Sequence, residues 1–289
     1  MPFYVFAWTA SILYSVYAII AKLVGKHKIK NIAQFSFFIT LFSGLVTGAI
    51  ALLNGATFPE NWTFIVLAAL FLSLGNILYL TVLKSLDISV MTPLFNLRVV
   101  ITVFLGFLFL GETLSTKSIL LIAIIVVAGI FATMDEKFST KSFFTKKIAL
   151  GIFFMLTLSV QTLFINRAVA QTNYWTAMLW MAILAIVFSF TFLVKRFYKD
   201  VLKSKASDYS GIILIALLGG IGDLAAYKAF SGNIGISSII VSLPLSMIFA
   251  FVLSLWKPDL LEKHTIKVYV LRFVSASIMI WGALQLSLK

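Results

Sequence analysis

Two ionisable side chains, Arg98 and Asp223, stand inside long apolar segments of the sequence. Arg98 heads the run VVITVFLGFLFLGE and lies about 13 Å from the nearest predicted surface, at the rise per residue of an α-helix. A charge at the centre of a membrane helix costs about 2.5–3.5 kcal/mol, so both side chains are predicted to face the protein interior. A guanidinium in that position can bind a carboxylate or phosphate with two hydrogen bonds, and a carboxylate can exchange a proton.

Three interpretations of Arg98 remain open at this point. Its long side chain can reach the cytoplasmic head groups, it can pair with Asp223 or with carbonyls at helix ends, or it can bind an anionic group of a cargo. Asp223 has two interpretations: it couples transport to protons, or it neutralises a basic partner. Tyr227 lies one turn from Asp223 on the same face, and the glycines of GGIGD predict the close approach of a neighbouring backbone.

Polar and aromatic residues in the middle of apolar segments are further candidates for the wall of a binding cavity. Tyr14 and Tyr17 are three residues apart and therefore share one face of a helix. Each such residue can equally be a packing or interhelical hydrogen-bonding residue. The predicted substrate-binding residues are Arg98, Asn96, Tyr14, Tyr17, Asn76, Tyr79, Gln161, Trp180, Tyr227 and Ser242, with Ser246 as a further wall candidate and Asp223 as the predicted ion-coupling residue.

The composition excludes most other classes of protein. Of the 289 residues 61% are hydrophobic and 11% are charged, whereas soluble domains carry about 25% charged residues, so a polytopic membrane protein is predicted. Cysteine is absent, and His27 and His264 lie in charged connecting segments; no catalytic residue, metal site or cofactor is predicted. No nucleotide-binding loop is present. The basic residues lie between apolar runs, which indicates membrane topology and no nucleic-acid partner.

Ten apolar segments of about 20 residues are predicted to cross the membrane, and each must be helical because backbone polar groups find no partner in lipid. The two halves of the chain align weakly. At an offset of 145 Lys22 falls on Arg167, and at 146 KSLDISV falls on FSGNIGI. The predicted fold is therefore an all-α membrane protein of two five-helix repeats, residues 1–135 and 148–289, joined by a cytoplasmic linker at 136–147.

The distribution of Lys and Arg among the connecting loops predicts that the two repeats are inverted. Odd-numbered loops hold 17 of these residues, whereas the even-numbered loops and the last residue together hold 4. By the positive-inside rule the odd loops are cytoplasmic, and both termini are predicted to lie on the non-cytoplasmic side of the inner membrane. An odd number of helices per repeat requires this inversion.

Several motifs resemble the EamA type of the drug/metabolite transporter superfamily over nearly the whole chain. They are AWTASILYSVYAIIAK, which ends in Lys22; DISVMTPLF; FLFLGETLSTKSILLIAIIVVAGI, with Gly111 and Glu112; and IGISSIIVSLPLSMIFAFVLSL, with Pro244. Two departures stand out: Lys257-Pro258 replaces Gly-Glu in the second half, and Arg98 replaces a mid-helix proline. Members of the family mostly keep their termini in the cytoplasm, whereas the loop charges here predict the reverse.

The resemblance implies a secondary transporter with two inverted bundles, a central cavity and alternating access. Gly111, Glu112, Pro244, Lys22 and Arg167 are its predicted structural signature, and Glu112 is expected to accept hydrogen bonds at the start of the fifth helix, where the helix dipole favours its charge.

The predicted function is the secondary-active or facilitative transport of a small polar metabolite, either amino acid-like or an organic anion, by a monomer or homodimer. Membrane lipids and the cargo are the expected partners, with protons as a candidate coupling ion. A non-transporting sensor or assembly subunit is an alternative. A membrane-embedded lipid-modifying enzyme is a weaker one, because no two carboxylates lie deep in the spans.

Overall fold

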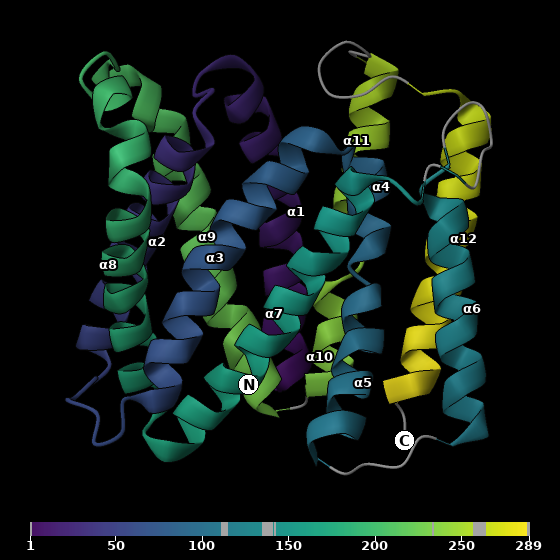
Figure 1. Cartoon of the computed structure of the whole chain (residues 1–289), viewed down its shortest axis with the longest axis horizontal. Helices are drawn as coiled ribbons and strands as arrows, with labels where there is room; N and C mark the ends of the chain where they lie inside the picture. The colour runs from purple at the N-terminus through teal and green to yellow at the C-terminus, as the bar shows by residue number, and fades with distance from the viewer. Residues whose placement is uncertain are drawn as a thin grey trace.

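The computed structural model describes residues 2–110, 115–134, 141, 143–232, 234–256 and 264–287. In these ranges the chain is a bundle of α-helices with one short 3-10 helix, η2, and no strand, which confirms the all-α prediction. α1 begins and α12 ends at the same end of the bundle (Figure 1). The elements are α1 (Phe3–His27), α2 (Ile32–Leu53), α3 (Thr63–Ser85), α4 (Ile88–Leu94), α5 (Leu97–Leu110), α6 (Thr116–Ala132), α7 (Lys146–Gln171), α8 (Tyr174–Val201), η2 (Ala206–Tyr209), α9 (Ser210–Gly232), α10 (Ile234–Val241), α11 (Leu245–Trp256) and α12 (Ile266–Ser287).

Eight segments of the described chain are long and apolar enough to cross a membrane. They comprise α1, α2, α3, α7, α8, α9 with η2, α11 with the end of α10, and α12. Two further apolar segments, Ile88–Ile101 and Thr116–Ala132, are shorter. The protein is thus a multi-pass membrane protein, and the crossing of the membrane by the two shorter segments stays a prediction.

The fourth predicted span is two helices, not the single helix expected from the sequence. α4 contains Pro93, which has no amide hydrogen to donate. The amides of Phe95 and Asn96 each bond to the carbonyl three residues back, at 3.1 Å, which is the pattern of a tight turn and not of an α-helix. The backbone therefore leaves the α-helical path between α4 and α5.

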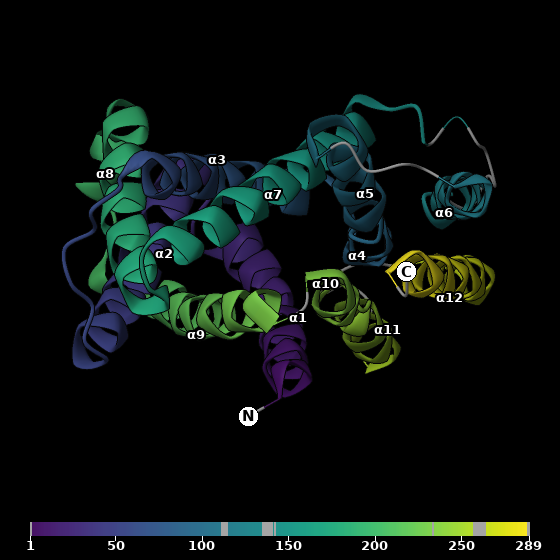
Figure 2. The same cartoon turned by 90° about the horizontal axis from the view of Figure 1, so that it is seen from below.

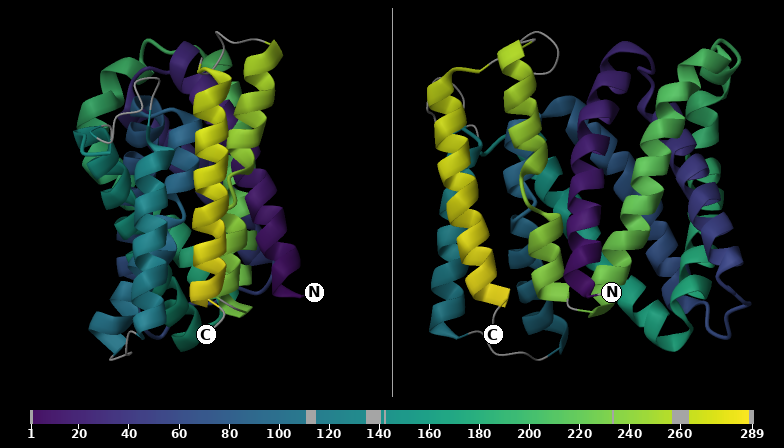
Figure 3. Two further views of the ribbon diagram at one scale, coloured as in Figure 1. Left: turned by 90° about the vertical axis from the view of Figure 1, so that its right-hand side faces the viewer. Right: turned by 180° about the vertical axis from the view of Figure 1, so that it is seen from behind.

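The ninth predicted span is interrupted in the same way, between α10 and α11. Pro244 cannot donate an amide hydrogen bond and disfavours a helical conformation at the residue before it. Ser242 and Leu243 again bond three residues back, at 3.1 and 3.2 Å. Figure 3 shows this interruption near the middle of the bundle's height, so the backbone is irregular at the depth where a membrane protein must bury it in protein or in a cavity.

The first and second halves of the chain are interleaved. The most extensive contacts of α1, α2, α3 and α6 are with α9, α8, α7 and α12, respectively. Smaller contacts join α2 to α9, α3 to α8, α4 to α11 and α5 to α7. Figure 2 shows α6 and α12 side by side at one edge of the bundle, with α2, α3 and α8 at the opposite edge. The buried core is consequently shared between the halves.

The loops after α1 and α8 meet at the other end of the bundle from the start of α1 (Figure 1). Asn31 donates to the carbonyl oxygen of Arg196 at 2.9 Å, and Gln34 donates to the hydroxyl oxygens of Ser204 and Tyr209 at 2.8 and 2.9 Å. These two loops carry many of the exposed lysines of the chain. Their position at one end agrees with the grouping of the odd-numbered loops.

Buried charges also gather at this end, around the turn between α3 and α4. His264 contacts Asp87 at 3.0 Å, and Lys22 donates to the carbonyl of Leu86. Arg272 of α12 donates to the hydroxyl of Ser89 and, at 3.2 Å, to the carbonyl of Met134. The network ties α1, α4, the end of α6 and α12 together.

Candidate functional site

A cavity of about 150 Å³ lies among helices of both halves. Its wall is formed by α1, α2, α3, α4, the start of α5, α7, α9 and the interrupted pair α10 and α11. Most of the wall is apolar or aromatic, with a few polar groups, which is the usual character of a small-molecule site. The predicted residues that line it are Tyr14, Tyr17, Asn76, Tyr79, Arg98, Gln161, Asp223, Tyr227 and Ser242, together with Ser246.

Asp223 of α9 is bound to a tyrosine of the opposite half of the chain. The hydroxyl of Tyr14 donates to its carboxylate at 2.5 Å. A side chain on Gly222 would lie 3.0 Å from the Tyr14 ring, and one on Gly219 would lie 3.0 Å from the Tyr17 ring. The missing side chains therefore leave room for both tyrosines of α1 beside the carboxylate.

The third glycine of this segment, Gly220, meets a backbone as predicted. A side chain there would lie 3.1 Å from the carbonyl oxygen of Ser43 in α2, so α2 and α9 approach each other closely at the level of the cavity. One turn beyond Asp223, Tyr227 accepts a hydrogen bond from Gln161 of α7 at 3.0 Å. The polar wall thus extends from α1 across α9 to α7.

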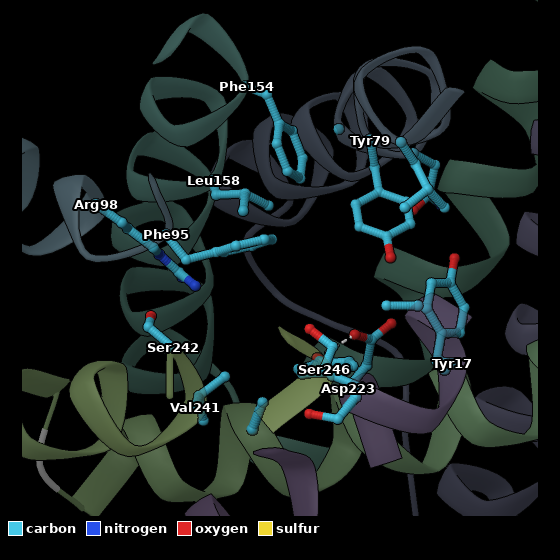
Figure 4. A pocket seen from close by; sticks show the side chains of 18 of the residues that line it. Tyr17, Tyr79, Phe95, Arg98, Phe154, Leu158, Asp223, Val241, Ser242 and Ser246 are labelled. Carbon is cyan, nitrogen blue, oxygen red and sulfur yellow. Dashed lines mark hydrogen bonds between the residues drawn. The ribbon is translucent and has the colours of Figure 1, made fainter. Parts of the chain in front are cut away.

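Arg98 lies in the first turn of α5, and its side chain is directed into the cavity (Figure 4). It is 7% exposed, donates to the hydroxyl of Thr162 and stacks over the ring of Phe230, 5.2 Å from the ring centre. No ion pair joins Asp223 to a basic residue in the part of the chain that the structure describes. The structure thus places Arg98 in the cavity wall, and its role toward a cargo stays a prediction.

The two helix interruptions meet at the cavity. Thr92 of α4 and Ser246 of α11 share a hydrogen bond of 2.8 Å between their hydroxyl groups. Ser242, at the interruption between α10 and α11, is 2% exposed, lines the cavity, and its hydroxyl has no hydrogen-bond partner among the described residues. Figure 4 places Ser242 and Arg98 on one side of the cavity, and Asp223 and Tyr17 on the other.

Two predicted binding residues lie elsewhere. Asn96 is fully buried at the first interruption, where its amide donates to the carbonyl of Pro93 at 3.1 Å, and it does not line the cavity. Trp180 lies in the second turn of α8, where its indole donates to the carbonyl of Thr57 at 2.9 Å and packs on Trp62 and Phe58. Its surroundings are those of a residue near the end of a membrane helix.

The predicted signature residues are dispersed. Pro244 forms the second interruption, and Lys22 bonds at the end of the bundle opposite the start of α1. Arg167 is exposed near the end of α7. Gly111 and Glu112 lie outside the described residues.

Several wall residues gave no signal in the sequence. Phe95, Phe154 and Leu158 line the cavity but are apolar, like residues that face lipid. Thr92 and Ser43 are small and polar, and such residues are common in membrane helices. In the described part of the chain no three His, Asp or Glu side chains gather as metal ligands.

The arrangement can enclose a small molecule in a largely apolar space and contact it from two chemically different sides. One side offers a cation and hydroxyl groups, and the other offers a carboxylate and the two tyrosines Tyr14 and Tyr17. These features suit binding and release.

Comparison with known proteins agrees with the fold. A solved crystal structure of a protein has a similar fold, with a TM-score of 0.61 and 14% sequence identity. The match covers 98% of this chain and 96% of the chain in that structure. No curated protein matches the sequence. The model of the EamA-like transporter family matches residues 1–134. The predicted resemblance is thereby confirmed over residues 1–134, the part of the chain that is similar to this family.

Proposed function

We propose that this protein is a secondary-active or facilitative transporter that moves a small polar metabolite, amino acid-like or an organic anion, across the inner membrane by alternating access. The observation that carries the proposal is the cavity, which is lined by helices of both halves and has both Arg98 and Asp223 in its wall. Two charged groups in the wall of one membrane cavity are costly unless they serve a ligand or a conformational change.

The helix contacts support an inverted-repeat arrangement. Suppose that α1 to α6 correspond in order to α7 to α12, so that α1 is equivalent to α7 and α3 to α9. Exchanging the halves then converts the contact of α1 with α9 into the contact of α7 with α3, and both contacts are present. It likewise converts the contact of α2 with α9 into that of α8 with α3. Both interrupted spans, the fourth and the ninth, are also equivalent under this exchange. Such repeats supply two conformations of similar energy that open to opposite sides.

Arg98 and Asp223 take different roles in this proposal. Arg98 provides a fixed positive charge for the anionic group of the cargo. Asp223, held by Tyr14, is the candidate coupling group: its protonation would remove the charge that the hydroxyl of Tyr14 stabilises and would allow α1 and α9 to separate. Facilitated transport without a coupled ion leaves Asp223 as a structural or cargo-binding group.

The test is uptake into proteoliposomes of amino acids, nucleosides, sugar phosphates and organic acids, with and without a pH gradient. We expect saturable flux for at least one class. The Arg98→Gln variant should lose anionic cargo at least ten-fold more than neutral cargo, whereas Arg167→Gln, which removes an exposed charge near the end of α7, should not. Equal loss for all cargo, or none, would contradict the role given to Arg98.

The coupling role has its own variant. Asp223→Asn keeps an oxygen that can accept from Tyr14 but cannot exchange a proton. We expect this variant to bind cargo and to lose the dependence of uptake on the pH gradient. Uptake by the native protein that ignores the gradient would assign the protein to the facilitative class.

The orientation is tested by single cysteines, because the chain contains none of its own. Cysteine at Ala56, in the loop after α2, is expected to react only from outside, and cysteine at Lys203, in the loop after α8, only from the cytoplasm. The reverse result would overturn the predicted topology. The proposed inner-membrane location does not depend on it.

A non-transporting sensor or assembly subunit is distinguished by the same assays. It would bind a ligand and show no flux for any compound of the screen. A lipid-modifying enzyme would instead change the chemical identity of its substrate. Release of unmodified cargo on the far side of the liposome excludes both.

A further inference from the structure

One residue of the cavity wall carries a hydroxyl group that makes no hydrogen bond within the described part of the protein. The hydroxyl of Ser242 lacks a hydrogen-bond partner among the described residues, although Ser242 is only 2% exposed. A buried polar group without a partner is unfavourable. Ser11 and Ser36 also have such hydroxyls but do not line the cavity. Ser242 therefore differs in that it is a residue of the cavity wall, beside the space a ligand would occupy.

Most of the neighbouring polar groups already bond to the protein, although the side-chain oxygen of Asn96 has no hydrogen-bond partner among the described residues. Thr92 and Ser246 bond to each other across the two interrupted helices. Asn96 aligns with Ser242 at the offset of 146 that also aligns other residues of the two halves. The side-chain amide of Asn96 donates to the carbonyl of Pro93, and Asn96 does not line the cavity. The two halves thus place a polar side chain at the same point of their interrupted spans, and only in the second half does it face the cavity.

The surroundings of Ser242 are electropositive. α11 begins three residues later, at Leu245. The amides of Leu245, Met247 and Ile248 bond to the carbonyls of Leu243 and Pro244, and the helix dipole gives this end of α11 a partial positive charge. Arg98 lies on the same side of the cavity (Figure 4). The carboxylate of Asp223 lies on the other side. A group that accepts a hydrogen bond from Ser242 is therefore favoured if it is negatively charged.

We propose that Ser242, the first turn of α11 and the charge of Arg98 form a binding site for one carboxylate group of the cargo. This inference deepens the proposed transport function, which supplies the cargo. A carboxylate fits better than a phosphate dianion because the site has one fixed cation, and Asp223 across the cavity disfavours a second negative charge. The aromatic wall at Phe95 and Phe154 suits an apolar body behind the carboxylate.

Thermal-shift titration of the purified full-length protein at pH 7 tests the site without knowledge of the natural cargo. Benzoate is the probe, benzamide is its uncharged counterpart of the same shape, and inorganic phosphate is the alternative anion. We expect benzoate to raise the melting temperature saturably, with an apparent affinity at least ten-fold higher than that of benzamide or phosphate.

Two serine variants give the decisive comparison. Ser242→Ala should weaken benzoate binding about ten-fold, as the loss of a hydrogen bond to a charged group predicts. It should leave the melting temperature of the ligand-free protein unchanged, since its hydroxyl bonds to nothing there. Ser36→Ala removes a buried hydroxyl that likewise has no hydrogen-bond partner among the described residues but does not line the cavity, and it should keep the benzoate affinity.

Four results would overturn the site. They are no stabilisation by benzoate, equal stabilisation by benzamide or phosphate, equal benzoate affinity in Ser242→Ala and the native protein, and a lower melting temperature of ligand-free Ser242→Ala, which would reveal a structural bond. Flux assays separate this inference from the proposed function. Benzoate binding without any flux would support the carboxylate site and contradict the transport function. Flux of cargo that lacks a carboxylate, with Ser242→Ala fully active, would support the transport function and contradict the carboxylate site.

Discussion

The two buried arginines, Arg98 and Arg272, carry the same charge in opposite kinds of surroundings. Arg272 is 1% exposed and reaches the hydroxyl of Ser89 and the carbonyl of Met134, where α4, α6 and α12 meet. Arg98 is 7% exposed, bonds to Thr162 and borders the cavity. Burial of a charge therefore does not by itself identify a binding residue. The space beside the guanidinium is the feature on which the proposed ligand-binding role of Arg98 rests.

The neighbourhood of Arg272 strengthens this contrast. Asp87 and His264 form an ion pair close by, and Lys22 caps the carbonyl of Leu86. Burial acts to raise the pKa of Asp87, but the hydrogen bond with His264 and the positive charges of Lys22 and Arg272 outweigh it and lower the pKa below its ordinary value. Each of these charged side chains thus has a partner within the protein, so the group is suited to a structural role.

The largest expected effect is the loss of stability on replacing Arg272. Arg272→Gln removes hydrogen bonds between a charged donor and two buried acceptors, each of which contributes about 1.5–3 kcal/mol. We expect the free energy of unfolding to fall by about 3 kcal/mol, measured by thermal melting and denaturant titration in detergent. Melting equal to that of the native protein would show that Arg272 is not structural.

Replacing Arg98 should have little effect on stability and a large effect on cargo binding. Arg98→Gln removes a buried charge whose desolvation offsets much of what its contacts contribute, so the free energy of unfolding should change by less than about 1 kcal/mol. Binding of an anionic cargo should fall at least ten-fold. A stability loss as large as that of Arg272→Gln would remove the distinction between the two arginines.

The smallest effect is expected at the ion pair of Asp87. Its carboxylate has a lowered pKa, so its contribution to stability is present above the ordinary value of about 4 and disappears as the pH falls through the pKa of the folded state. The side chain is 41% exposed, and screening limits the contribution to about 0.5 kcal/mol. Asp87→Asn should lower the melting temperature slightly at pH 7, and the difference should shrink as the pH falls below about 4. A constant difference across this range would indicate a packing effect.

Much of the site could be predicted from the sequence because polar side chains are disfavoured against lipid. Tyr14, Tyr17 and Asn76 stand out from apolar segments for that reason, and all three line the cavity. Phe95 and Phe154 could not be recognised, since an apolar ring suits lipid and a cavity equally well. The contacts of Phe154 with Tyr79 and Phe95 become visible only after the helices are placed.

The helix interruptions and Trp180 show where the sequence was insufficient. Prolines are tolerated in membrane helices, so Pro93 and Pro244 did not predict that two spans are divided. Trp180 was assigned to the cavity because it follows the start of an apolar segment by several residues. The structure places it in the second turn of α8, beside Thr57, where depth along the helix, not residue type, decides its role.

The interleaved packing of the two halves has a consequence for the synthesis of the protein. α1, α2, α3 and α6 find their principal partners in α9, α8, α7 and α12, which leave the ribosome later. Residues 1–134, although a recognisable unit of sequence, must therefore wait in the bilayer with incomplete tertiary packing until the remainder is inserted. Premature termination within the second half would leave a product that membrane quality control can detect and degrade.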